Sequence, residues 1–127
     1  MNRQAALKSY NNVHVDAGVE SASSHRLIEM MFEGLLSRLA QAKGAIQQKD
    51  MELKGQKITS AISIVLGLRD SLDLETGGEV AANLDGLYDY IQRTLWQANL
   101  KNDESLINEC GTLVSQISSA WRQIGKS

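Results

Sequence analysis

The chain has 127 residues, with 13 basic against 15 acidic side chains, one cysteine and no proline. This length favours a single domain, and such a chain buries enough surface to fold without a disulfide or a structural metal ion. The formal charge of -2 provides no basic field to hold a phosphate backbone, so we expect no nucleic acid among its partners.

Residues 1–22 are predicted to form an N-terminal arm, because polar residues interrupt every apolar period and Gly18 breaks what remains. They lack the continuous apolar block of a signal peptide, and no apolar run in the chain reaches the roughly 20 residues that span a bilayer. We therefore expect no direct membrane insertion. Leu7 and Tyr10 share one face of a helical turn, so either they dock together on a partner or the arm is a frayed terminus.

Four amphipathic stretches follow the arm, because apolar residues recur there at spacings of three, four and seven. Ser23, Asp50 and Asp103 are of the residue types that cap helix N-termini, and they precede the first, second and fourth stretches. The first helix is expected to end near Gln48, and the third near Asn99.

The second helix is expected to include Leu72 and to end near two adjacent glycines, Gly77 and Gly78, which form the turn to the third helix. All the connections between the four helices are short, which makes neighbouring helices antiparallel. Residues 23–127 are therefore predicted to form one all-α domain, an up-down-up-down four-helix bundle.

The apolar stripes of these helices differ in width. The large aliphatic residues of the third helix fall within roughly 100°, the width that one core needs, so we expect that helix to be fully used by its own core. Those of the second helix spread over roughly 200°, and those of the first over roughly 180°. Either the surplus forms an apolar groove for an amphipathic partner segment, or a central helix simply touches two neighbours. The candidate groove residues are Ile58, Ile62, Ile64, Val65, Leu68 and Leu72.

Side chains that carry catalysis or bind metals are sparse. His14 and His25 lack a second ligand at the helical spacing of a metal site, and Cys110 lies on an apolar stripe with no basic residue near it in sequence. Asp85 and Asp89 lie four residues apart, either as a general acid–base pair or as a charged surface pair. We therefore expect no enzyme, no metal and no cofactor, and the lone cysteine fits a reducing cytosolic compartment.

Two other classes of protein remain as alternatives. A histidine phosphotransfer domain is also a small four-helix bundle that presents one histidine, and His25 is the only candidate for that role. Ile28 occupies the position at which the motif of that family has a lysine. The second alternative is a purely structural helical bundle.

Three stretches of the chain, which occur in order and at matching spacing, resemble the motifs of the flagellar secretion chaperone family FliS. The first is SASSHRLIEMMFEG at residues 21–34. The second is LDLETGGEVAANL at residues 72–84, followed by LYDY at 87–90, and the third is ANLKND at 98–103. The resemblance covers nearly the whole chain.

This resemblance implies a cytoplasmic export chaperone that binds the C-terminal segment of flagellin, prevents its premature polymerisation and delivers it to the flagellar type III export gate. It implies no catalysis, and we expect a monomer or a weak homodimer. Leu7 and Tyr10 match residues of the family's arm, and the resemblance implies that this arm docks at the gate and also covers the groove when the client is absent. Trp96 interrupts a stretch that is usually basic in the family and projects away from the core stripe, so it is either a client contact or a partly exposed aromatic residue.

Overall fold

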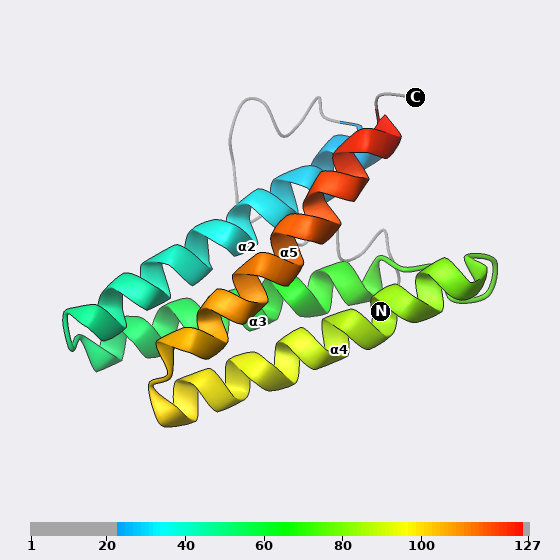
Figure 1. The fold of residues 1–127 in the computed structure, drawn as a ribbon. Coiled ribbons are helices and arrows are strands. Elements are labelled where there is room, and N and C mark those ends of the chain that lie inside the picture. The colour runs from blue at the N-terminus through cyan, green and yellow to red at the C-terminus, as the bar shows by residue number, and fades with distance from the viewer. Residues whose placement is uncertain (1–22, 126–127) are drawn as a thin grey trace.

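The computed structural model describes residues 23–125, which form four α-helices (Figure 1). The helices are α2 (Ser24–Gln47), α3 (Met51–Asp70), α4 (Gly78–Lys101) and α5 (Glu104–Gly125). The predicted N-terminal arm, with Leu7 and Tyr10, lies outside the described residues. The prediction of an all-α bundle is confirmed.

The helices begin where the capping residues predict. Ser23 and Asp50 each accept a hydrogen bond, at 3.1 Å, from the backbone N–H three residues later. Asp103 Oδ1 accepts from the backbone N–H of Ser105 at 2.9 Å and from its hydroxyl at 2.6 Å. These side-chain acceptors satisfy donors that a helix leaves free in its first turn. The bonds from Ser105 also hold the pKa of Asp103 below its ordinary value.

This lowered pKa predicts a pH-dependent contribution of Asp103 to stability. The ionised cap stabilises the fold above the ordinary carboxyl pKa of 3.8, and that contribution is lost as the pH falls through the lower pKa of the folded state. We expect Asp103→Ala to lower the urea midpoint at neutral pH, and the difference from the original chain to shrink in acid. A difference of equal size at both pH values would contradict this assignment.

The second helix ends earlier than the sequence predicts. α3 stops at Asp70, and Leu72 lies in the connection to α4 instead of on the last turn of α3. The Asp73 carboxylate accepts from the backbone N–H groups two and three residues later, both at 3.2 Å, and this local turn competes with continued helix. Gly78 begins α4 with a φ of 59°, a left-handed conformation that favours glycine.

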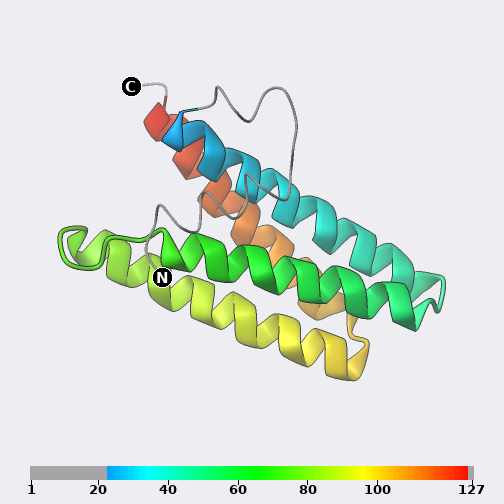
Figure 2. The same cartoon turned by 180° about the vertical axis from the view of Figure 1, so that it is seen from behind.

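The four helices form an antiparallel bundle in which α2 and α4 each pack against both α3 and α5. α2 and α5 form one pair and α3 and α4 the other. The two pairs lie close together where α2 ends and α5 begins, and they diverge toward the start of α2 and the end of α5 (Figures 1 and 2). The largest fully buried side chains come from all four helices: Met31, Phe32, Leu35, Ile58, Val65, Leu68, Ile91, Leu95, Ile107, Cys110 and Val114.

Charged side chains join α3 to α4 on the outside of the bundle. Arg69 Nε donates to Asp85 Oδ1 at 2.6 Å, and its Nη1 donates to Asp89 Oδ1 at 3.2 Å. The pKa of Arg69 is raised, mainly because its guanidinium donates to the Asp85 carboxylate. At the other end of the pair, Lys54 Nζ donates to the carbonyl of Asn99 at 2.9 Å and so places a cation at the C-terminal end of α4. The Asp85 and Asp89 carboxylates are therefore engaged in holding two helices together.

Candidate partner-binding grooves

An apolar groove of about 540 Å³ lies at the end of the bundle where the two helix pairs diverge. We call it the open-end groove. It is formed by the start of α2, the α3–α4 connection, the first half of α4 and the end of α5. Its apolar lining residues are Ile28, Phe32, Leu72, Val80, Ala81, Leu84, Leu87, Tyr88, Ile117, Ala120, Trp121 and Ile124, and its remaining lining residues are Ser71, Asp73, Gly77 and Gln116.

Large aliphatic side chains on the rim of this groove are exposed to solvent. Val80 on α4 has 70% of its surface exposed, Ile124 on α5 has 64%, and Leu87 is also exposed. Beneath them, Phe32 and Tyr88 are almost completely buried. Exposed apolar side chains around a recess are typical of protein–protein contacts and of other binding sites. The open-end groove therefore offers both a floor and an apolar rim to a partner.

The expectation that the third helix is fully used by its own core is wrong for its first half. Val80 and Leu87 belong to the narrow apolar stripe of α4, yet both are exposed. The physical reason is the divergence of the helix pairs, which takes the end of α5 away from the start of α4 and leaves this part of the stripe uncovered (Figure 2). Helical periodicity identifies the stripe but not the distance to the next helix.

Trp121 forms part of the groove wall, and two contacts to α2 hold it in place. Its indole Nε1 donates to the carbonyl of His25 at 2.9 Å. The indole and imidazole rings also stack, with 4.4 Å between their centroids and 6° between their planes. The two interactions join the start of α2 to the end of α5 beside the open-end groove.

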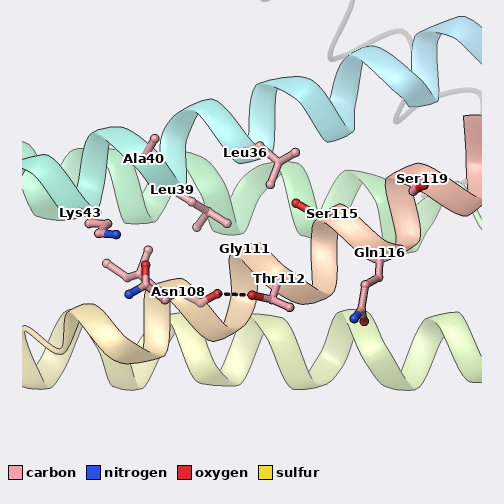
Figure 3. Close-up of a pocket in the computed structure, with 11 residues that line it drawn as sticks. Leu36, Leu39, Ala40, Lys43, Asn108, Gly111, Thr112, Ser115, Gln116 and Ser119 are labelled. Carbon is pink, nitrogen blue, oxygen red and sulfur yellow. Dashed lines mark hydrogen bonds between the residues drawn. The ribbon is translucent and has the colours of Figure 1, made fainter.

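A second recess, of about 720 Å³, lies between α2 and α5, and we call it the α2/α5 groove (Figure 3). Its side chains come from α2 on one side and from α5 on the other, and its α5 side is more polar, with Thr112 donating to the carbonyl of Asn108 at 3.1 Å. Gln116 lines both grooves, so the two recesses meet at α5. The lining residues are Leu36, Leu39, Ala40, Lys43, Ile107, Asn108, Gly111, Thr112, Ser115, Gln116 and Ser119.

The structure buries most of the residues that the sequence proposes for a groove on α3. Ile58, Val65 and Leu68 have no exposed surface, and Ile62 and Ile64 are 6% and 7% exposed. α3 packs against both α2 and α4, so these neighbours cover most of its wide apolar arc, although Leu66 is 41% exposed. The sixth candidate, Leu72, is half-buried and lines the open-end groove. A role of this set in partner binding stays a prediction.

Trp96 lies apart from both recesses. It is 54% exposed on α4, and it is not among the residues that line either groove. A client contact through Trp96 therefore also stays a prediction, as do the roles of Leu7 and Tyr10 outside the described residues.

The residues of α4 and α5 that line the open-end groove were not selected as candidates from the sequence. Their helical spacing does not separate them from truly buried neighbours, because all of them lie at core-type positions on their stripes. They are Val80, Leu84, Leu87, Ile117, Trp121 and Ile124. Asp73 is a weak sequence signal for this groove, because aspartate favours a short turn at this point of the chain. That turn takes Leu72 out of the helix, and Leu72 then lines the groove.

Residues 23–125 contain neither a cluster of side chains placed to hold a metal ion nor a helix that could span a membrane. Within residues 23–125, no three or more His, Cys, Asp or Glu side chains are placed to hold a metal ion. Among the helices of the same range, none is long and apolar enough to cross a bilayer.

Cys110 is fully buried, and its thiol donates weakly to the carbonyl of Ile91 at 3.8 Å. Burial is the main cause that raises the pKa of Cys110 to about 12, so the reactive thiolate is scarce at neutral pH. We expect iodoacetamide to label the folded protein at least about a hundredfold more slowly than the urea-unfolded protein. Similar labelling rates in the two states would show that the thiol is accessible.

Comparison with known proteins identifies relatives along almost the entire chain. The family model described as "Flagellar protein FliS" matches residues 6–127. The chain is 47% identical to the flagellar secretion chaperone FliS of Salmonella typhimurium over 121 residues, which are 94% of this chain and 90% of that protein. It is 46% identical to the flagellar secretion chaperone FliSB of Pseudomonas aeruginosa over 116 residues, 91% of this chain and 92% of that protein. With FliS of Bacillus subtilis it shares 30% identity over 118 residues, 93% of this chain and 87% of that protein.

Proposed function

Because the chain belongs to the FliS family of flagellar secretion chaperones, we propose that it is an export chaperone for flagellin. It acts in the cytoplasm as a non-catalytic binding protein. It holds the C-terminal segment of newly made flagellin, which prevents premature polymerisation, and it delivers the subunit to the flagellar type III export gate. Leu7 and Tyr10 of the arm dock at that gate.

The observation that carries this proposal is the open-end groove, with its buried floor and its exposed rim of Val80, Leu87 and Ile124. Covering a large aliphatic side chain contributes about 1.5–3 kcal/mol before the cost of ordering the partner is subtracted. An amphipathic helix inserts such side chains at spacings of three and four, which suits a recess between two helices. The client therefore gains helix as it binds, whereas the chaperone is already folded.

The binding path extends from the open-end groove along the bundle. The α2/α5 groove receives a second part of the client, since both recesses meet at Gln116. Leu72 contacts the client directly. The other candidate residues of α3 are buried and contribute by holding α3 in its position in the bundle. Trp96 contacts the client on the outer surface of α4.

A calorimetric titration of the full chain with the C-terminal segment of flagellin tests the proposal. We expect saturable heat, together with far-ultraviolet ellipticity that exceeds the sum of the two separate components. A scrambled segment of the same composition is the control, since its apolar residues lack helical spacing. Absence of binding by the true segment would contradict the proposed function.

The phosphotransfer alternative is not favoured by the surroundings of His25. A phosphoryl-accepting imidazole must present a nitrogen to solvent, but Nε2 of His25 is buried and the ring is stacked on Trp121. Incubation with a phosphorylated response regulator checks this, and we expect no acid-labile phosphate on His25.

A further inference from the structure

We propose that His25 is a positioning residue whose ring holds Trp121 in the wall of the open-end groove and so sets the affinity of that groove for its partner. This inference rests on the proposed function, because it assigns a role at the same site. Its starting point is the stack of the two rings, at 4.4 Å and nearly parallel, across the junction of α2 and α5.

The hydrogen bonding of His25 indicates that the shape of its ring is what matters. Nε2 is buried and, within the described part of the chain, has no hydrogen-bond partner. The bond that Trp121 donates ends on the backbone carbonyl of His25, which any residue at this position supplies. What the imidazole itself contributes is a flat surface of limited size against the indole.

The end of α5 is fitted to this ring. A Cβ atom built on Gly125 would lie 2.3 Å from Nε2 of His25 and 2.7 Å from its Cδ2, closer than real contacts allow. Glycine at this position therefore leaves the space that the imidazole occupies. His25, Trp121 and Gly125 form one unit, which we call the ring clamp.

The ring clamp acts on the groove through Trp121, the only one of its three members that lines the recess. The stack fixes one face of the indole, and the bond to the backbone fixes its Nε1. Loss of the imidazole leaves a void on one side of the indole. The Trp121 side chain can then adopt further rotamers, and these do not fit against the bound partner. A preformed wall avoids the cost of ordering this side chain on binding.

Two replacements test the ring clamp without altering any groove-lining residue. His25→Ala removes the ring, and Gly125→Ala displaces it. We expect each to raise the Kd for the C-terminal segment of flagellin about three- to tenfold, because this is the change in affinity that corresponds to the free energy of one aromatic pair. Gln47→Ala is the matched control, because it also removes a contact between α2 and α5, the 2.6 Å bond to Glu104, but at the far end of the pair.

The second readout is the indole N–H resonance of Trp121 in ¹⁵N-labelled protein, assigned by its retention in Trp96→Phe. We expect both test variants to shift this resonance and to speed the exchange of the indole hydrogen with solvent. We expect circular dichroism to show an unchanged helical content. The control leaves both the resonance and the Kd unchanged. A His25→Ala protein that stays folded with the original resonance, or that loses no more affinity than Gln47→Ala, overturns the inference.

Failure of the inference and failure of the proposed function give different results. If the original chain does not bind the flagellin segment, the proposed function fails, and the affinity effect of the ring clamp fails with it. If the original chain binds and both ring variants bind equally well, the function stands and the positioning role of His25 is refuted.

Discussion

Replacing Val80 with aspartate and Ile124 with lysine is expected to weaken binding of the flagellin segment on the order of a hundredfold. Both side chains lie on the rim of the open-end groove and are mostly exposed, so neither change disturbs the core. Each new charge also suits its position, since aspartate lies in the first turn of α4 and lysine in the last turn of α5. A partner with apolar anchors must then desolvate two charges. Calorimetric titration measures the loss.

The matched control is a second charge pair on exposed apolar residues away from both recesses. Met51→Asp in the first turn of α3 and Leu66→Lys on the same helix add the same two charges, and neither residue lines a groove. We expect the control to keep the original affinity. Equal losses in the two double variants would mean that net hydrophobicity, and not the open-end groove, determines binding.

Leu35→Ala is expected to reduce the free energy of unfolding by about 3 kcal/mol. Leu35 has no exposed surface and lies in the central core of the bundle. The truncation removes apolar contacts and leaves a cavity that close packing cannot refill completely. Urea unfolding followed by circular dichroism measures the change as a lower midpoint with an unchanged slope.

Leu100→Ala is the control for this stability prediction, because the Leu100 side chain is 79% exposed near the end of α4. We expect a change within about 0.5 kcal/mol. If the two leucine variants unfolded at the same urea concentration, the placement of Leu35 in the core would be wrong.

Local signals in the chain predict its elements well, because helix formation and capping depend on neighbours within a few residues. Ser23, Asp50 and Asp103 mark three helix starts, and the structure confirms each one. The end of α3 was predicted too late, since the turn formed by Asp73 outweighs the helical propensity of the residues around it. The motifs at residues 21–34, 72–90 and 98–103 also predict the family, which the comparisons confirm.

The sequence by itself determined four amphipathic helices, their antiparallel order and a net charge of -2, since these follow from periodicity, connection length and composition. Only the tertiary structure decided which apolar residues are core and which form a groove. Most of the wide arc of α3 is buried because two helices flank it, and only part of it, such as Leu66, stays exposed. The narrow stripe of α4 is exposed at Val80 and Leu87 because the helix pairs diverge there. The physical reason is that burial depends on the distance and angle between helices, which the period of a single helix does not encode.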